Sequence, residues 1–301
     1  MKWSSHGYWL KSKTYLARAV EAGRHNEERA LWRSLSLEHL LRSALTHVHP
    51  ALNADPQNEG NNLLYAFGFN VQGEPRSIPV HSVTSRLEKI IEPFKKPERE
   101  FCDFFLMKRN EEMHTADVPF ATMAEAEWSP RYYEVCKILN EFIGHTLEEY
   151  FGPEEAASAG QVIQARQSAK LGDVKKRIAR HEAAFVSLSD QAREALATAQ
   201  SAAASGWLDE HLTGTKCPAC GSVSRLTGTL ERTSEPIYKE GAFMVEKVFL
   251  ANTLVCGACA LHLRDIEEVL LAGVQPHFSA LVHTDLHEFY EPDEDHFYMN
   301  M

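Results

Sequence analysis

The sequence predicts a mainly α-helical protein with a small β-rich module near its C-terminal end. Apolar residues recur at three- and four-residue steps through the first half of the chain, and the stretch from Pro153 to Ser205 is rich in alanine and glutamine. Beyond Trp207, threonine, valine and phenylalanine partly alternate between glycine-containing turns. We therefore expect a helical domain over residues 1–152, a helical connector over 153–206, a β-rich module with a C-terminal helix over 207–275, and an acidic tail over 276–301.

The composition is that of an ordinary globular chain. The 301 residues are 44% hydrophobic and 24% charged, and the formal net charge is −11. No N-terminal apolar run resembles a signal peptide, and no run approaches the roughly 20 residues of a membrane span, so we expect a cytoplasmic protein without a membrane partner. The negative charge argues against a general binder of polyanions but leaves room for a local basic site.

The helical half divides into several elements. A first helix is expected over roughly residues 8–21. In LWRSLSLEHLLRSALTHVHP the apolar residues fall on one helical face, and this second helix ends near Pro50. Residues 51–80 are rich in asparagine, glycine and proline, and predict a long irregular connection. A short helix around residues 87–94 and a longer one through PEREFCDFFLMKRNEEMH follow.

Proline and glycine signals set the later boundaries. Ser129 followed by Pro130 predicts a helix start, because proline lacks an N–H that the first turn does not need. The apolar stripe of RYYEVCKILNEFIGHTLEEYF then completes a bundle of four or five helices. In the connector, Gly172 predicts an interruption, with Asp173 and Ser189 or Asp190 as helix caps.

Two Cys-x-x-Cys pairs give the most specific local signal in the chain. Cys217 and Cys220 lie in CPACG, and Cys256 and Cys259 lie in CGAC, with predicted strands between the pairs. Each pair offers two thiolates to one ion, and four thiolates complete a tetrahedral site with no open position for water or substrate. A redox motif would need one pair in a βαβ setting, and unrelated surface cysteines are the other alternative. We expect a zinc ribbon that holds a structural Zn²⁺.

An arginine followed five positions later by a histidine occurs three times. The pairs are Arg42 with His47, Arg76 with His81, and Arg109 with His114. Pro79 favours a loop for the second pair, and the first lies on a helix whose apolar face belongs in a core. The third pair follows an apolar helix face where the pattern turns polar. There Asn110 and His114 share a face, and the long Arg109 side chain can reach round to join them. A histidine and an arginine suit RNA cleavage by the RNA's own 2′-hydroxyl, as general acid or base and as phosphate ligand.

The stretch RNEEMH resembles the signature of HEPN domains (higher-eukaryote and prokaryote nucleotide-binding): an arginine, a polar residue after it and a histidine five positions on. The setting in a helical bundle fits, and the resemblance covers roughly residues 8–152. It implies a HEPN-like bundle that acts as a metal-independent endoribonuclease and as a homodimer, with two motifs meeting across the interface, in a toxin or an effector of antiviral defence. It further implies that Arg109 binds the scissile phosphate, that His114 is general acid or base, and that Asn110 orients one of them.

Basic residues cluster in the connector around Asp173. They are Lys170, Lys175, Lys176, Arg177 and Arg180. This cluster either extends an RNA path toward the ribbon or is a solvated helix face. The predicted ribbon strands are also basic, through Arg225, Arg232, Lys239 and Lys247.

The tail VHTDLHEFYEPDEDHFYMNM alternates acids with aromatic residues and lacks lysine and arginine. It suits a segment that binds a protein regulator, a mimic of RNA in the basic site, or a disordered end without a role. A function of a different class also stays open: a non-catalytic adaptor that binds protein or nucleic acid through the helical domain and the zinc ribbon.

Overall fold

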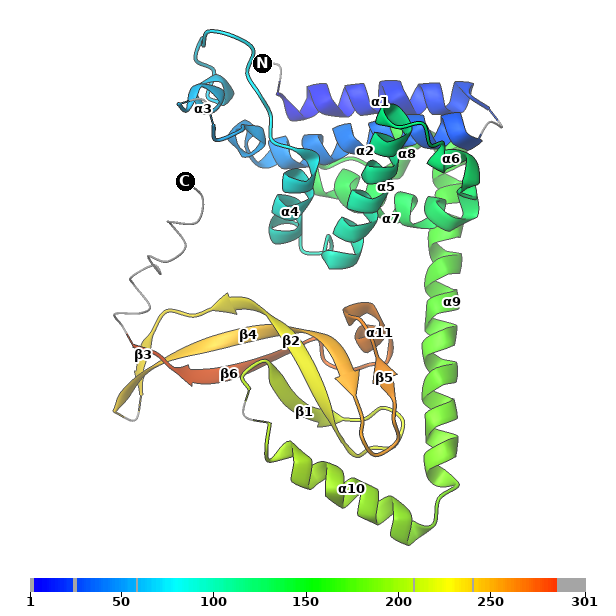
Figure 1. Cartoon of the computed structure of the whole chain (residues 1–301), viewed down its shortest axis with the longest axis vertical. Helices are drawn as coiled ribbons and strands as arrows, with labels where there is room; N and C mark the ends of the chain where they lie inside the picture. Colours follow the sequence, from blue (N-terminus) through cyan, green and yellow to red (C-terminus); the bar gives the residue numbers. More distant parts are fainter. Residues whose placement is uncertain (1–2, 24–25, 58, 208, 240, 286–301) are drawn as a thin grey trace. The chain divides into compact units, whose positions relative to one another are not determined.

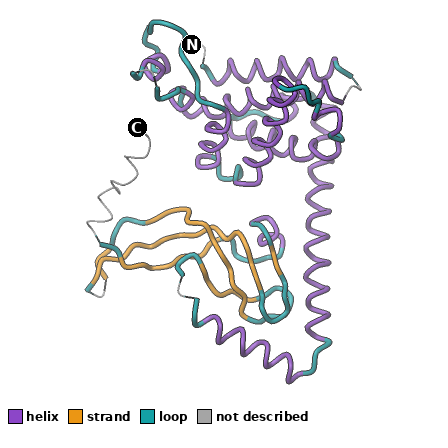
Figure 2. The backbone as a smooth tube through the Cα atoms, viewed as in Figure 1, coloured by secondary structure: helices purple, strands orange, loops and turns teal. Residues whose placement is uncertain are grey.

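The computed structural model describes residues 3–23, 26–57, 59–207, 209–239 and 241–285. The chain divides into two compact units, residues 1–166 and 167–301. Helices occur in both units and the strands lie in the second (Figures 1 and 2), so the mainly α-helical prediction is confirmed. Because the boundary falls at Arg166, the predicted connector over residues 153–206 is not a separate part of the fold.

The first unit is a bundle of helices around one core. Its elements are α1 (Ser5–Glu21), α2 (Asn26–Val48), a 3-10 helix (Pro50–Asn53), α3 (Asn61–Ala66), α4 (Val80–Ile90), α5 (Lys96–His114), α6 (Pro119–Thr122), α7 (Glu125–Phe142), α8 (Leu147–Phe151) and the first part of α9 (Pro153–Val186). Apolar residues at helical spacing, such as Leu37 and Leu41 of α2 and Phe105 of α5, are fully buried in this core. Helices α1 and α2 pair most extensively (Figure 1).

A buried arginine lies inside the aromatic part of this core. Arg33 of α2 is fully buried and forms an ion pair with Glu155 at the start of α9. Its guanidinium lies 5.3 Å from the ring centre of Tyr132 and 5.4 Å from that of Tyr133. Glu155 also accepts a hydrogen bond from the Tyr133 hydroxyl at 3.0 Å. The buried charge is therefore matched by one carboxylate and by aromatic faces, which ties α9 to the bundle.

Two predicted helix boundaries are wrong. Helix α7 begins at Glu125, so Pro130 lies inside it and one backbone hydrogen bond is missing there. Helix α9 runs through Gly172 without interruption. A single glycine in an alanine-rich helix costs only about 1 kcal/mol, and the neighbouring Val174 is buried in the core of the second unit. The predicted cap at Ser189 is confirmed, since its hydroxyl accepts the N–H of Ala192 at 3.3 Å.

The second unit contains the later part of α9, helix α10 (Asp190–Ala204) and an antiparallel sheet. The strands are β1 (Leu212–Lys216), β2 (Val223–Thr233), β3 (Ile237–Lys239), β4 (Ala242–Val255), β5 (His262–Leu263) and β6 (His277–His283), and α11 (Ile266–Leu271) precedes the last strand. Strand β4 is central: it pairs with β2 and β3 along one edge and with β5 and β6 along the other. Strands β2 and β4 lie between the two cysteine pairs, where the sequence predicts strands.

Strand β6 corrects the expected boundary of the acidic tail at residue 276. Phe278 of β6 pairs with Phe249 of β4, and the two rings stack with centres 5.3 Å apart. Gly228 on β2 lies against the Phe278 ring and the Cβ of Phe249, so that a Cβ at position 228 would come within 2.7 Å of the former and 2.9 Å of the latter. Residues 277–283 therefore belong to the sheet. The remainder of the tail, residues 286–301, lies outside the described residues.

Candidate functional sites

The two Cys-x-x-Cys pairs meet in the second unit. Cys217 and Cys220 lie between β1 and β2, and Cys256 and Cys259 lie between β4 and β5. All four Sγ atoms lie within 4.8 Å of one another, and the Cys217–Cys259 and Cys220–Cys256 distances are both 3.6 Å. A tetrahedral site with metal–sulfur bonds of about 2.3 Å places its sulfurs about 3.8 Å apart. The arrangement therefore fits four ligands of one metal ion, as the spacing predicts.

Both turns carry the same backbone geometry. Cys217 donates its N–H to Ser222 at 2.9 Å, and Cys256 donates its N–H to Leu261 at 2.9 Å. The residue after the second cysteine adopts a positive φ in each turn, 74° at Gly221 and 58° at Ala260. The left-handed region suits glycine, whereas alanine there is strained. The second turn thus holds its thiolates with a small backbone penalty.

A supporting hydrogen bond and the ionisation of the thiols are both consistent with a cation bound by the four sulfurs. His181 of α9 binds the carbonyl of Cys259 through Nδ1 at 2.8 Å, and so supports the second turn. Hydrogen bonds from the Cys217 and Cys259 thiols lower the pKa of Cys256. The hydrogen bond between Cys217 and Cys256 in turn raises the pKa of Cys217. Four thiols this close cannot all ionise without a compensating positive charge.

The stretch RNEEMH forms the last turns of α5. Asn110 and His114 are exposed and, four residues apart, lie on the same side of the helix. The acids between them have partners: Glu111 pairs with Lys108 at 2.8 Å, and Glu112 accepts the backbone N–H of Phe120 at 3.4 Å. The exposed end of this helix is therefore an amide and an imidazole open to solvent.

Arg109 points to α2 instead of joining Asn110 and His114. Its Nη1 contacts Glu38 Oε2 at 2.5 Å, and the Arg109 side chain is largely buried. Arg42 approaches the other oxygen of Glu38 at 3.0 Å. Burial acts to raise the pKa of Glu38, but the charges of Arg42 and Arg109 outweigh it and hold the pKa below its ordinary value. Two guanidinium groups thus share one ionised carboxylate beside the motif.

The other two arginine–histidine pairs differ from this arrangement. Arg42 is buried and also donates from Nη1 to Asn53 at 2.8 Å, which agrees with a structural role. Arg76 lies in the connection before α4, and His81 is an exposed residue of the first turn of that helix. The loop that Pro79 predicts therefore holds Arg76 but not His81.

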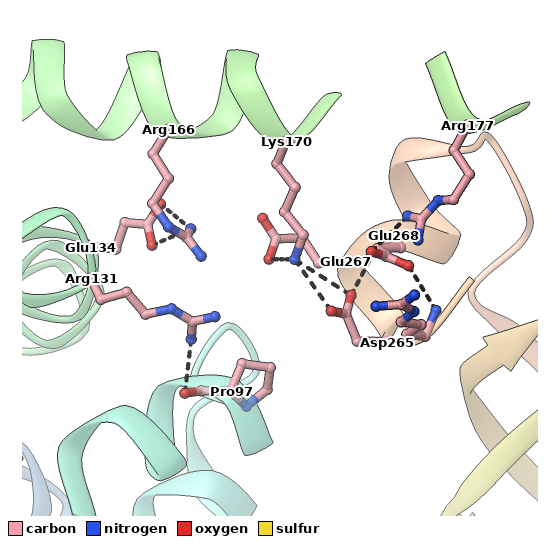
Figure 3. A network of polar contacts seen from close by, with 10 residues as sticks. Pro97, Arg131, Glu134, Arg166, Lys170, Arg177, Asp265, Glu267 and Glu268 are labelled. Carbon is pink, nitrogen blue, oxygen red and sulfur yellow. Dashed lines mark hydrogen bonds and ion pairs between the residues drawn. The ribbon is translucent and has the colours of Figure 1, made fainter. Parts of the chain in front are cut away.

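The five basic residues of α9 are not equally available. Lys170 forms ion pairs with Asp265 and Glu267, and Arg177 pairs with Glu268 at 2.7 Å (Figure 3). Lys175, Lys176 and Arg180 are exposed. Lys176 and Arg180 border an open pocket of about 440 Å³, which is also lined by Asp173, Arg177 and Glu268.

Two of the five basic residues, Lys170 and Arg177, are thus neutralised by carboxylates on and beside α11, about 90 residues further along the chain. In the first unit the same helix carries Arg166, which binds both oxygens of Glu134 at 2.9 and 2.7 Å. Of the basic residues predicted on the ribbon strands, Arg225, Arg232 and Lys239 are exposed, whereas Lys247 donates to Glu210 at 2.7 Å.

Comparisons with protein-family models, with curated proteins and with solved structures found no match to this chain. Within the described residues, no helix combines the length and the apolar composition needed to cross a bilayer. Function is therefore inferred from the sites themselves.

The sequence alone does not indicate Glu38. The available signal is the helical stretch LEHLLR, in which Glu38 and Arg42 are four residues apart on a helix that is otherwise apolar on that side. A charged pair on a buried face requires partners from elsewhere in the fold. Its partner Arg109 comes from α5 and cannot be read from local spacing.

Proposed function

We propose that residues 1–166 form an endoribonuclease of the HEPN type, in which RNEEMH cleaves RNA without a catalytic metal ion. One observation carries this proposal. At the end of α5, Asn110 and His114 are exposed on one side, and the adjacent Arg109 is fixed by Glu38. Cleavage by a 2′-hydroxyl requires an accessible imidazole and a guanidinium, and this helix end supplies both, although Arg109 points toward α2.

The chemistry needs two proton transfers. The 2′-oxygen of a ribose attacks the adjacent phosphorus while the bond from phosphorus to the 5′-oxygen breaks. A base takes the proton of the 2′-hydroxyl, and an acid protonates the leaving 5′-oxygen, which yields a 2′,3′-cyclic phosphate and a 5′-hydroxyl. The substrate supplies the nucleophile, so no metal-bound water is required. Because the attacking and leaving oxygens lie on opposite sides of phosphorus, two imidazoles serve better than one.

A homodimer supplies the second His114. Next to Asn110 and His114, α5 also exposes Met107 and Met113, which are 52% and 55% accessible. Each methionine is three residues from Asn110, so both lie near the motif on the helix surface. Exposed apolar side chains beside a catalytic motif support a dimer contact there.

Arg109 is suited to bind the scissile phosphate. Glu38 engages Nη1 of Arg109. A guanidinium that is fixed through one nitrogen can still donate to a phosphate oxygen through another. In this proposal Arg109 stabilises the charge that develops on the phosphate, His114 transfers a proton, and Asn110 orients the phosphate or the imidazole.

We further propose that the four cysteines hold one structural Zn²⁺. The sulfur separations fit tetrahedral thiolate ligation, and four protein ligands leave no position for water. When bound, the ion contributes folding free energy to the second unit and not chemistry to the reaction.

The test is cleavage of cellular RNA in EDTA by wild type, His114→Ala and His81→Ala. His81→Ala is a matched control because His81 is also exposed on a helix and also follows an arginine by five positions. Exposure to EDTA is kept short to preserve the ribbon. We expect cleavage with cyclic phosphate ends by wild type and His81→Ala and loss in His114→Ala. Cleavage that survives in His114→Ala contradicts the proposal.

The adaptor is the second candidate, and exposed apolar residues away from α5 favour it. Phe67 and Phe69, after α3, are 61% and 62% accessible, and Tyr238 of β3 is 69% accessible. Surfaces of this kind are typical of protein contacts. A stable complex with another protein that is indifferent to His114→Ala, with no cleavage by wild type, would support this function.

A further inference from the structure

A row of aromatic rings lies along the seam between α1 and α2 in the first unit. Tyr15 stacks on Trp32 with ring centres 5.9 Å apart and planes 15° apart. It stacks on His39 on its other side, at 5.3 Å and 10°. His39 in turn stacks on Tyr8 at 6.0 Å and 18°. Four rings from two helices thus form one nearly parallel series, which we call the aromatic seam.

The aromatic seam lies at the edge of the core, where Tyr8 packs against a small buried cluster and its hydroxyl accepts from Asn53 at 3.1 Å. The buried positions of α1 are Trp9, Ser12, Leu16 and Ala19. Tyr8 and Tyr15 flank these positions and are half-buried, as are Trp32 and His39 of α2. All four rings therefore keep accessible surface.

Basic side chains accompany the rings along the same helix face. On α1 the order is Tyr8, Lys11, Tyr15, Arg18, at steps of three or four residues. Lys11 and Arg18 are exposed. The Arg18 guanidinium lies 5.0 Å from the ring centre of Trp32 and 5.5 Å from that of Tyr15. A planar cation therefore covers one end of the aromatic seam.

An inner ring of the aromatic seam, His39, lies close to the proposed catalytic arginine. His39 follows Glu38, which binds Arg109, and the charge of Arg109 acts on His39. Burial, together with the charges of Lys11, Arg42 and Arg109, lowers the pKa of His39 to about 4, and Glu38 is the one named neighbour that opposes them. Cations thus outnumber carboxylates around His39, although the whole chain has a net charge of −11. Local charge is complementary to phosphate.

We propose that the aromatic seam, with Lys11 and Arg18, binds single-stranded RNA and directs it to Arg109. This inference rests on the proposed nuclease function and names the form of its substrate. The faces of Tyr15 are occupied by Trp32 and His39, so a base of a single strand stacks on the exposed Arg18 plane, which the rings beneath it hold in place. Lys11 contacts the RNA backbone. Bases in a duplex are paired and stacked on one another, so a duplex cannot offer a base to this plane.

Binding is measured with a fluorescent single-stranded RNA whose 2′-hydroxyls are methylated. This probe cannot be cleaved by 2′-hydroxyl attack, so its affinity is independent of catalysis. The full chain with zinc is compared with Trp32→Ala and Arg18→Gln. Tyr238→Ala, on the second unit, and Lys96→Gln, an exposed lysine at the start of α5, are the matched controls.

We expect Trp32→Ala to weaken binding roughly 5- to 150-fold, the range that loss of one base stack gives. Arg18→Gln, at an exposed position that leaves the fold intact, is expected to weaken binding several-fold and to reduce the salt dependence by about one phosphate contact. The two control variants should bind the single-stranded probe as wild type does. A methylated duplex probe should bind to wild type more weakly than the single-stranded probe.

Unchanged affinity in both variants, no binding by wild type, or equal binding of the duplex overturns the inference. A change in oligomeric state with unchanged RNA affinity assigns the aromatic seam to a protein contact and also overturns it. Failure of the nuclease proposal is seen separately, because it is the absence of His114-dependent cleavage. Binding that is lost only in the variants of the aromatic seam supports the inference whether or not cleavage is found.

Discussion

Replacing Cys256 by serine tests the metal centre most directly. Cys256 is fully buried and lies 3.6 Å from Cys220 across the two turns. Serine is similar in size but is a poor zinc ligand, so the change removes one of four thiolates with little change in packing. Three sulfurs remain to bind the ion.

The expected magnitude follows from the shared ligation. Structural zinc sites with four protein ligands have apparent binding free energies of about 10–16 kcal/mol. Divided over four sulfurs, each contributes about 3–4 kcal/mol, so Cys256→Ser should weaken zinc binding by roughly 100- to 1000-fold. Cys217 and Cys256 are also members of the second unit's hydrophobic core. Loss of zinc should therefore loosen the sheet as well as the turns.

The assay is zinc content per chain after purification, followed by a zinc titration in competition with a chelator. We expect one zinc per chain in wild type, and substitution by cobalt should give the visible spectrum of tetrahedral thiolate ligation. Cys102→Ala is the matched control: Cys102 is equally buried, lies in the first unit, and has a pKa raised well above the ordinary value by burial. Equal zinc affinity in wild type and Cys256→Ser would refute the four-sulfur site.

Two further predictions concern stability. Ala260→Gly relieves a positive φ and should stabilise the second unit by about 1 kcal/mol, whereas Gly221→Ala should destabilise it by a similar amount, measured by urea unfolding with zinc present. A change of the same sign in both variants would refute the role of φ. His39 has a pKa of about 4 in the folded chain, below the ordinary 6.5. The unfolded chain therefore binds the proton first as pH falls from 6.5 to 4, and the first unit should lose about 2 kcal/mol between pH 7.5 and 5. His39→Phe should lose less over the same interval, and tryptophan fluorescence reports it because four of the five tryptophans lie before residue 167.

Much of the fold follows from local patterns in the sequence. The apolar faces of α2 and α5, the cap at Ser189 and strands β2 and β4 are all predicted, because each depends on residues within a few positions of one another. Pro130 and Gly172 were misleading for the same reason. Both residues weaken a helix locally, but packing of α7 and α9 against distant parts of the chain carries the helix through them.

Strand β6 could not be predicted from its own residues. The stretch HFSALVH contains no acid, but it leads directly into the acidic and aromatic segment that begins at Asp285, and such a segment is typical of a tail. Its pairing with β4 depends on a partner about 30 positions earlier, at the register that places Phe278 on Phe249. Non-local pairing of this kind leaves no periodic signal beyond a short alternation.

The candidate sites also differ in how far their residues can be predicted from local sequence. The four cysteines are predictable because two ligands of each pair lie on one turn, and only the approach of the two turns is non-local. Glu38 and the aromatic seam are not predictable, since they require α1, α2 and α5 to be placed against one another. The partners of Lys170 and Arg177 on and beside α11 are equally remote in sequence.

These charge pairs bear on where RNA should bind. On α9, an RNA phosphate would have to displace Glu267 from Lys170 and Glu268 from Arg177, and only Lys175, Lys176 and Arg180 are exposed. Around the aromatic seam the charges of Lys11, Arg18, Arg42 and Arg109 stand against Glu38, and the rings add stacking that α9 does not offer.

Neutralising Lys175, Lys176 and Arg177 removes three positive charges, but it should reduce the salt dependence of RNA binding by fewer than three phosphate contacts. Arg177 is already paired, so at most two phosphate contacts are lost from the slope of affinity against salt concentration. A loss of three or more contacts would place the main RNA path on α9. An unchanged slope would leave the aromatic seam as the path that the charges favour.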